Sequence, residues 1–348
     1  MSLVLHKALP IEFQKGPLLL LETSGHIQEN RESFEIDERD LIKSNSILGR
    51  GNFGEVFKWI LRRDDILMEV AVKRCRIYTN EQRYLVAKEL EIMCMLGRHP
   101  NIIGFMGAVT VNARSTLLVL EYADCRNLLD FLRVRRDIFK NQLLSDDLGA
   151  LNTLDLVSYA FQIANGMKYL ASIMCVHRDL ALRNCLVTHN KTIRVADFGL
   201  AREQKNEYYR MRTDPGLPYN WMPIESMKDF DANIMTKFNE KTDVWSFGVC
   251  LYELFTLGDR PYENVDNVSK FLDSGKRLSE PEYCPTEIYE LMEKCWDRDP
   301  LLRPNFAMCA EMLKDQLRGL SEQAYHELQN KLGEVAEEQE KLECIIRK

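Results

Sequence analysis

The chain has 348 residues, 45% of them hydrophobic and 28% charged, a balance typical of a soluble protein with one large or two modest domains. The net charge of −7 argues against a general nucleic-acid-binding protein. The longest early apolar cluster, residues 18–21, is far shorter than the roughly 18 residues that span a bilayer, and no signal-peptide pattern precedes it. The ten scattered cysteines include no CxxC pair, which favours free thiols in a reducing compartment over a zinc site.

Residues 1–39 are expected to form a flexible lead-in, because no hydrophobic period is sustained up to about residue 33. Residues 40–123 are rich in strand-like segments, including 70–73 and 117–120. Between those two strands, residues 81–96 carry apolar side chains at helical spacing. This part of the chain is therefore predicted to be a small β-rich lobe with one helix.

Residues 124–317 show mainly helical patterning, with candidate helices at 154–170 and 244–257. They are predicted to form a larger helical lobe. The predicted fold class is therefore α+β, with two lobes.

Residues 318–348 differ from both lobes, because their apolar residues alternate at spacings of three and four, as in the a/d seam of about three heptads. The seam comprises Tyr325, Leu328, Leu332, Val335, Gln339, Leu342 and Ile346. Gly333 and the polar Gln339 weaken the pattern, and so short a helix needs a partner. A frayed or docked helix is favoured over a self-associating coiled coil.

A glycine-rich segment at residues 48–56 has the form GxGxxGxV. Glycines let the backbone approach a polyphosphate closely. Dinucleotide-binding folds use GxGxxG too, but between a strand and a helix. Here a second strand-like run follows at 56–61, and Lys73 comes shortly afterwards, so a nucleotide-phosphate site is favoured over a plain tight turn.

Lys73 needs a carboxylate partner if it is to be held as a phosphate ligand. Glu89 and Glu91 both lie in the next predicted helix, and Glu89 is chosen because it falls on the side facing the strands. The alternative is that both glutamates are surface charges.

The segment 177–184, with the sequence HRDLALRN, is followed by the Asp-Phe-Gly triplet 197–199. Asp179 is a candidate base, and Asn184 and Asp197 supply the oxygen ligands that magnesium prefers. In this order and spacing, the motifs between Asp40 and Leu317 resemble those of eukaryotic protein kinases.

The resemblance implies a protein kinase that uses ATP and Mg²⁺, with Mn²⁺ as an alternative. Lys73, paired with Glu89, would hold the α- and β-phosphates, Asp179 would accept the substrate hydroxyl proton, and Asn184 and Asp197 would bind the metal. The residues implied to contact ATP are Leu48, Gly49, Arg50, Gly51, Asn52, Phe53, Gly54, Glu55, Val56, Ala71, Lys73, Glu121, Ala123 and Leu186.

The specificity implied by the resemblance is for tyrosine. Ala181 replaces the lysine usual in serine/threonine kinases, and Arg183 supplies the charge two residues later. Pro218 and Trp221 resemble the tyrosine-kinase docking loop. Downstream, Glu225 is retained although the residues before it depart from the usual Ala-Pro, and an ion pair between Glu225 and Arg303 is implied.

Tyr208 and Tyr209 lie where the family carries activation-loop phosphosites, with Arg178 and Arg202 implied as a clamp for the new phosphate. The alternative is that they are ordinary loop tyrosines. Residues 156–164 and 166–172 look closest to receptor tyrosine kinases of the fibroblast and vascular growth factor type.

The implied partners are ATP and protein tyrosine substrates, with self-association for trans-phosphorylation and without nucleic acid. The implied location is the cytoplasm, with membrane attachment only if the chain belongs to a longer receptor. A non-catalytic kinase-like scaffold and a serine/threonine or dual-specificity kinase are the alternatives, but Lys73, Asp179 and Asp197 are all retained.

Overall fold

The computed structural model describes residues 34–51, 54–112, 114–139, 151–204, 218–232 and 237–346. The chain divides into two compact units. One comprises Met1–Met95, Phe105–Glu121 and Ile345–Lys348, and the other comprises Leu96–Gly104 and Tyr122–Cys344. Among the described helices, none has the length and apolar character that crossing a bilayer would require.

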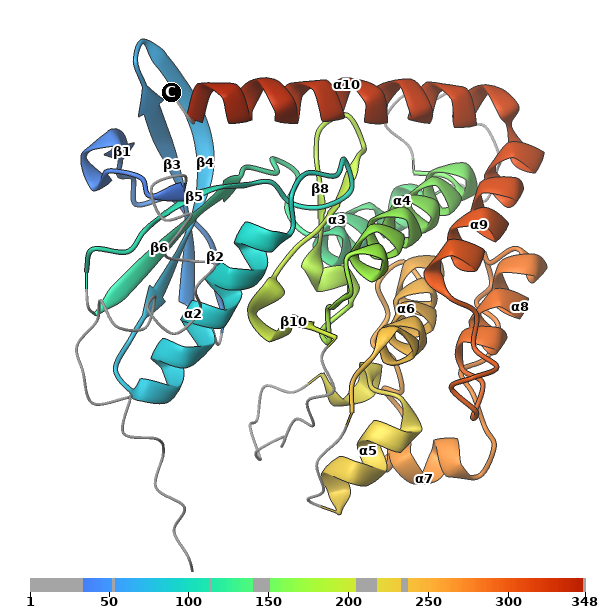
Figure 1. Ribbon diagram of the computed structural model, residues 1–348. Coiled ribbons are helices and arrows are strands. Elements are labelled where there is room, and N and C mark those ends of the chain that lie inside the picture. The colour runs from blue at the N-terminus through green and yellow to red at the C-terminus, as the bar shows by residue number, and fades with distance from the viewer. Residues whose placement is uncertain are drawn as a thin grey trace, which may run out of the picture. The chain divides into compact units, whose positions relative to one another are not determined.

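The first unit is built on a six-stranded antiparallel sheet in the order β1-β3-β4-β6-β5, with β2 paired to β3 (Figure 1). The strands are β1 (Leu41–Ile42), β2 (Ile47–Gly51), β3 (Gly54–Arg63), β4 (Ile66–Arg76), β5 (Phe105–Val109) and β6 (Ser115–Glu121). Helix α2 (Asn80–Met95) buries Glu89, Leu90, Ile92 and Met93. Leu90 packs with Cys75 of β4, Ala108 of β5 and Leu118 of β6, so one face of α2 covers the sheet.

Among the described residues, packing already includes Phe34, which precedes the lead-in boundary expected at residue 39. Phe34 and Ile36 are 7% and 1% exposed, and the Ile36 amide donates to the Ala108 carbonyl at 2.8 Å. Glu35 points the other way and accepts hydrogen bonds from the Thr110 amide and hydroxyl. Residues 34–36 thus alternate between apolar and polar side chains, and Glu35 forms a short parallel bridge with Ala108 of β5. Three residues are too few to predict a strand from the sequence.

The second unit is mainly helical. Its helices are α3 (Leu128–Arg135), α4 (Thr153–Ser172), α5 (Ile224–Asp231), α6 (Glu240–Phe255), α7 (Val268–Asp273), α8 (Thr286–Cys295), α9 (Phe306–Leu320) and α10 (Glu322–Ile346). Two small two-stranded sheets accompany them, β7 (Cys175–Val176) with β10 (Arg202–Glu203) and β8 (Cys185–Val187) with β9 (Ile193–Val195).

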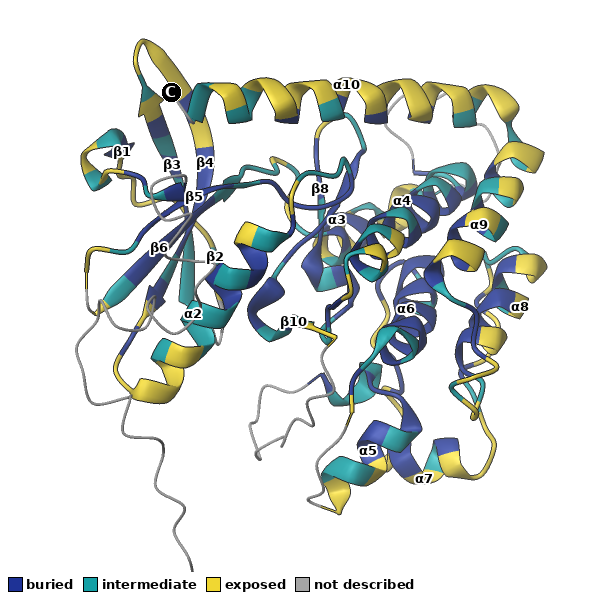
Figure 2. Ribbon diagram, viewed as in Figure 1, coloured by how far each residue is buried: buried dark blue, intermediate teal, exposed yellow. Residues whose placement is uncertain are grey.

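Helices α4 and α6 form the core of this unit and pack against each other, α4 also against α9 and α6 against α8. Both begin at a capping box, Asn152 with Asp155 for α4 and Asn239 with Thr242 for α6, which satisfies the free amides of the first turn. Helix α6 is almost entirely buried, as its dark blue ribbon in Figure 2 shows, so it is packed on all sides within this unit.

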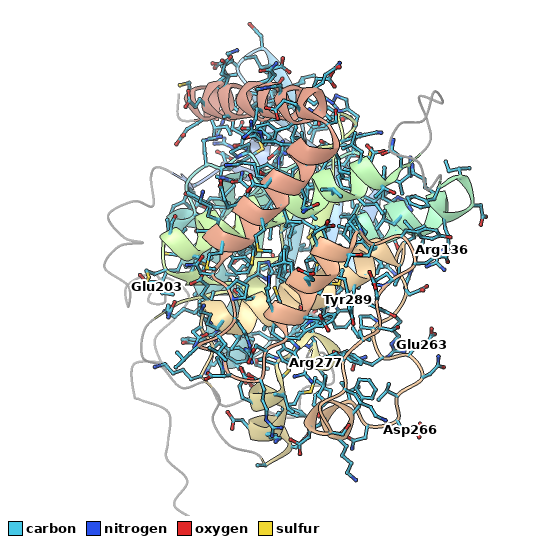
Figure 3. All side chains as sticks on the ribbon, turned by 90° about the vertical axis from the view of Figure 1, so that its right-hand side faces the viewer. Arg136, Glu203, Glu263, Asp266, Arg277 and Tyr289 are labelled. Carbon is cyan, nitrogen blue, oxygen red and sulfur yellow. The ribbon has the colours of Figure 1, made fainter. Side chains whose placement is uncertain are left out.

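The basic residues at the end of α3 are exposed and also bind the end of α6. Arg133 donates to the Gly258 carbonyl at 2.8 Å, and Arg136 donates to the carbonyls of Thr256 and Leu257 at 3.0 Å. Figure 3 shows Arg136 at the edge of the unit. Cations at a helix C-terminus satisfy its free carbonyls and complement its dipole, so these arginines stabilise α6.

Candidate active site

The glycine-rich segment forms the hairpin between β2 and β3, with Gly51 opposite Gly54 and Gly49 opposite Val56. Gly54 has φ +138°, and a Cβ there would lie 2.2 Å from the Arg74 carbonyl oxygen. At Gly49 a Cβ would meet no atom within 4 Å, so open space adjoins the backbone there. Gly54 is thus required by the protein's own packing, whereas Gly49 leaves room for a ligand. Asn52 and Phe53 lie outside the described residues.

Other predicted ATP contacts lie in the hairpin itself or on neighbouring strands of the sheet. Leu48, the first residue of the segment, is 40% exposed, and Ala71 lies opposite Leu120 on β6. Arg50 and Arg76 both approach the Glu55 carboxylate, at 3.5 and 2.6 Å. Val56 and Glu121 are half-buried in this unit, as are Ala123 and Leu186 in the other.

The Lys73 ammonium lies 2.6 Å from the Glu89 carboxylate, with Lys73 7% and Glu89 2% exposed. Glu91, the alternative partner, instead pairs with Lys88 at 2.8 Å in a more exposed position. The structure therefore brings Lys73 together with Glu89, as the choice of helix face predicted. A buried charge is costly unless paired, so each side chain holds the other in place.

In the helical unit, Asp243 on α6 anchors the segment from His177 to Asn184. The Asp243 carboxylate accepts hydrogen bonds from the backbone amides of His177 at 2.7 Å and Arg178 at 2.9 Å. The His177 ring nitrogen Nε2 also contacts the Ala196 carbonyl at 3.1 Å, and burial lowers the pKa of His177. Asp243 therefore fixes the backbone just before Asp179. This role of Asp243 was not predicted from the sequence.

Asp179 is held by two neighbours. Arg183 donates to its Oδ1, and the Asn184 side-chain amide donates to its Oδ2 at 2.9 Å and to its carbonyl at 2.7 Å. Burial raises the pKa of Asp179 to about 6, against the opposing effect of the Arg183 charge. The carboxylate is therefore mostly ionised at neutral pH, yet more basic than an ordinary aspartate.

Asn184 and Asp197 fit the requirements of a hard divalent cation. The Asn184 amide nitrogen is turned to Asp179, which leaves its side-chain oxygen as the available ligand. The Ala196 amide donates to the Asn184 carbonyl at 2.8 Å and so ties the two segments together. Asp197 has φ 62° and ψ 74°, a left-handed conformation that non-glycine residues seldom adopt and that commonly marks functional sites.

Trp221 and Arg183 are also brought together, with the guanidinium 4.5 Å from the indole ring. The Trp221 indole N–H donates to Glu253 Oε2 at 2.9 Å, and the Leu182 amide donates to the same oxygen at 3.1 Å. Glu253 is 1% exposed, and burial raises its pKa to about 7. This residue of α6 was missed; the available signal was a lone glutamate inside the apolar run 244–257.

The segment before Glu225 departs from the usual pattern without losing the expected ion pair. Arg303 is 1% exposed and donates two hydrogen bonds of 2.8 Å to the Glu225 carboxylate. Pro223 is the residue before α5, and Ile224 is buried at its start. The substitutions are therefore accommodated at a helix N-terminus, where proline needs no amide hydrogen. Pro218 is buried at the start of the short 3-10 helix η7 (Tyr219–Trp221).

The predicted phosphosites Tyr208 and Tyr209 lie outside the described residues. Of the predicted clamp, Arg202 donates to the Gly199 carbonyl at 3.2 Å, and the Arg178 guanidinium lies 5.0 Å from the Phe238 ring.

Comparison with known proteins agrees with this geometry. Residues 42–313 match the family model described as protein tyrosine and serine/threonine kinase. The chain is 40% identical to the receptor-like tyrosine-protein kinase kin-15 of Caenorhabditis elegans, over 90% of this chain and 72% of that protein.

Two longer relatives match as well. The chain is 37% identical to the tyrosine-protein kinase receptor ver-3 of Caenorhabditis elegans, over 99% of this chain and 32% of that protein. It is 41% identical to the fibroblast growth factor receptor of Halocynthia roretzi, over 80% of this chain and 38% of that protein. The chain thus spans about a third of these two receptors. The predicted resemblance and the α+β kinase fold are confirmed: the chain belongs to the protein tyrosine and serine/threonine kinase family.

Proposed function

We propose that the chain is a receptor-like protein-tyrosine kinase, which transfers the γ-phosphoryl group of ATP to tyrosine hydroxyls of protein substrates. Family membership and relatives named as tyrosine-protein kinases support this reading. The observation that carries it is the position of Arg183, which binds Asp179 on one side and stacks on Trp221 on the other.

In this proposal Asp179 orients the acceptor phenol. The phenol oxygen forms the new bond to the γ-phosphorus, the bond between that phosphorus and the bridging oxygen breaks, and ADP leaves. Asp179 accepts the phenol proton, a role suited to a carboxylate whose pKa is raised to about 6. The transition state of phosphoryl transfer is loose, so positioning and charge neutralisation contribute more than a strong base.

Lys73, fixed by Glu89, is assigned to the α- and β-phosphates, and the hairpin carrying Gly49, Gly51 and Gly54 is assigned to cover them. Asn184 and Asp197 would hold Mg²⁺, which neutralises phosphate charge when bound. Mn²⁺ has the same preference for oxygen ligands and is the alternative.

Trp221 and Pro218 are assigned to the peptide-docking platform. A tyrosine hydroxyl lies farther from the peptide backbone than a serine hydroxyl, so the platform must be set back from Asp179. The link from Asp179 through Arg183 to Trp221 fixes this separation through side chains that are themselves anchored on α6.

Regulation is proposed to act through phosphorylation of Tyr208 and Tyr209, in trans between two copies of the chain, with Arg178 and Arg202 binding the new phosphates. The reaction is placed in the cytoplasm, or at the cytoplasmic face of a membrane if the chain is part of a longer receptor.

The test is transfer of radiolabelled phosphate from ATP to a tyrosine-containing peptide in the presence of Mg²⁺. The parent should incorporate label, and Asp179→Asn should lose nearly all activity while retaining its melting temperature. Equal incorporation by the parent and by Asp179→Asn would refute the assignment.

A further inference from the structure

Tyr78 is the most exposed tyrosine in the part of the chain that the structure describes. It is 75% exposed, and Tyr84, at 39%, is the only other exposed tyrosine among the described residues. Tyr84 lies inside helix α2, where the backbone on both sides of it is committed to helical hydrogen bonds. Tyr78 instead lies in the short connection between β4 and α2, outside any helix or strand. Its phenol is therefore open to another molecule.

The backbone on both sides of Tyr78 is fixed. Ile77 is 9% exposed, and its amide donates to the Arg114 carbonyl at 2.8 Å, one step beyond the pairing of β4 with β6. The amides of Tyr78 and Thr79 donate to the Gln82 side-chain oxygen at 2.8 and 3.2 Å. Figure 2 shows the start of α2, which follows directly, in the yellow of exposed residues. The Tyr78 phenol is thus presented to solvent by a held segment.

Arg76 and Tyr78 lie on the same outward side of this segment. Burial alternates along it, because Cys75 and Ile77 are 1% and 9% exposed whereas Arg76 and Tyr78 are both exposed. In an extended chain, residues two apart point to the same side. The Arg76 guanidinium therefore lies on the face from which the Tyr78 phenol projects.

Arg76 carries positive charge that its partner does not fully neutralise. It lies 2.6 Å from the Glu55 carboxylate, and Arg50 approaches the same carboxylate at 3.5 Å. Two guanidinium groups thus share one carboxylate. The Arg76 side chain is 52% exposed, so its pair with Glu55 is weak and easily exchanged. A phosphate on Tyr78 would carry about two negative charges and several acceptor oxygens, which makes it a stronger partner for arginine than a shared carboxylate.

We propose that Tyr78 is a phosphorylation site, modified in trans by a second copy of this chain, and that Arg76 then leaves Glu55 to bind the new phosphate. The Tyr78 phenol oxygen forms a bond to the γ-phosphorus of ATP on the other copy, and the bond from that phosphorus to the bridging oxygen breaks. ADP leaves, and the phenol proton passes to Asp179 of that copy. The identity of the donor rests on the proposed kinase function, whereas the exposure of Tyr78 and the charge around Arg76 do not.

The consequence falls on the glycine-rich hairpin. Glu55 directly follows Gly54, and its pair with Arg76 joins this end of β3 to the end of β4. When Arg76 turns to the phosphate, that tie is lost and Glu55 keeps only the more distant Arg50 of the two arginines. Because the hairpin is assigned to cover the ATP phosphates, phosphorylation of Tyr78 weakens ATP binding. The modification is thus a negative feedback on the reaction that produces it.

The donor is tested by mixing the active parent with an Asp179→Asn chain labelled with heavy nitrogen, in the presence of Mg²⁺ and ATP. Trypsin cleaves after Arg76 and Arg83, so residues 77–83 form a fragment whose only tyrosine is Tyr78. Phosphotyrosine is expected in the heavy fragment, which can receive it only in trans.

The phosphate should disappear from the heavy fragment when that chain also carries Tyr78→Phe, and Tyr84→Phe, the matched control, should leave it unchanged. A tyrosine peptide that is phosphorylated in the same mixture while the heavy fragment stays unmodified would overturn this proposal and leave the kinase function intact. Phosphotyrosine in neither would refute the kinase function and this donor with it.

The role of Arg76 is tested by ATP kinetics after preincubation with ATP. KM for ATP in the phosphorylated parent should exceed that of Tyr78→Phe, treated in the same way, by roughly two- to fivefold, the scale of one exposed ion pair. Arg76→Gln should show the same rise before phosphorylation and no further rise after it. Arg62→Gln, which removes an exposed arginine at the far end of β3, should behave as the parent. An unchanged KM in the phosphorylated parent, or a further rise in Arg76→Gln, would overturn this role.

Discussion

Trp221 and Glu253 are joined by a 2.9 Å hydrogen bond from the indole N–H to a buried carboxylate, directly beside the Arg183 side chain that binds Asp179. The carboxylate also accepts the Leu182 amide, so one group on α6 holds both the proposed docking platform and the loop that carries Asp179. In the proposed function, the spacing between Trp221 and Asp179 is thereby set by one buried helix.

Trp221→Phe keeps an aromatic ring under Arg183 but removes the N–H that Glu253 accepts. We expect KM for a tyrosine peptide to rise roughly three- to tenfold, from the loss of one hydrogen bond worth about 1 kcal/mol, while KM for ATP stays unchanged. Steady-state kinetics with each substrate varied in turn will measure this. Tyr219→Phe, which removes a hydroxyl bound to the exposed Asp231, is the control; an ATP effect as large as the peptide effect would contradict the assignment.

Gly54→Ala and Gly49→Ala should separate structure from ligand binding. At Gly54 the new Cβ would lie 2.2 Å from a backbone oxygen at φ +138°, so we expect a loss of about 2 kcal/mol or more in unfolding free energy. At Gly49 the Cβ meets nothing, so stability should be kept while KM for ATP rises. Thermal melts and ATP kinetics on both variants provide the comparison. Equal melting temperatures for the two variants would contradict it.

The pH dependence of turnover should show an acid limb near pH 6, because Asp179, with its pKa raised to about 6, must be ionised to accept a proton. Glu253, with a pKa near 7, is a second group that titrates nearby, so the profile should be repeated in Glu253→Gln. A limb that persists there near pH 6 assigns it to Asp179. A limb that disappears would assign it to Glu253 instead.

The raised pKa of Asp179 also predicts that the stability of the fold depends on pH. The folded protein binds the Asp179 proton more tightly than the unfolded chain, whose pKa is near 3.8. Its contribution to folding is therefore fully present below pH 3.8 and is lost as the pH rises through about 6. Asp179→Asn should flatten this part of the stability curve, as denaturant titrations at several pH values will show.

Lys73→Met should reduce phosphoryl transfer by orders of magnitude, because Glu89 then loses its partner and the phosphates lose a cation. Lys88→Met removes a lysine paired with Glu91 on the same helix and is the matched control. The prediction fails if the Lys73 and Lys88 variants turn over at similar rates.

The sequence was sufficient to bring together residues that lie close along the chain. Asp179, Arg183 and Asn184 lie within six residues, and the loop geometry brings them together directly. The choice of Glu89 over Glu91 needed only the helical period that turns one of them toward the sheet.

What could not be predicted depends on pairings across long stretches of chain. Glu253 meets Leu182 across 71 positions and Asp243 meets His177 across 66, and nothing in the local pattern gives those distances. Arg98 pairs with Glu343 of α10 across 245 positions, so the seam of α10 indicated a helix with a partner but not which segment it would bind. The pairing of residues 34–36 with β5 was likewise not predicted, because the alternating pattern there is only three residues long.

The central claim, transfer to tyrosine, is tested most directly by phosphoamino-acid analysis of two peptides that differ only in carrying tyrosine or serine at the acceptor position. With Mg²⁺ and labelled ATP, we predict phosphotyrosine in the first peptide and almost no label in the second. The phosphotyrosine should be lost in Asp179→Asn. Phosphoserine formed at a comparable rate, or no phosphotyrosine at all, would contradict the account.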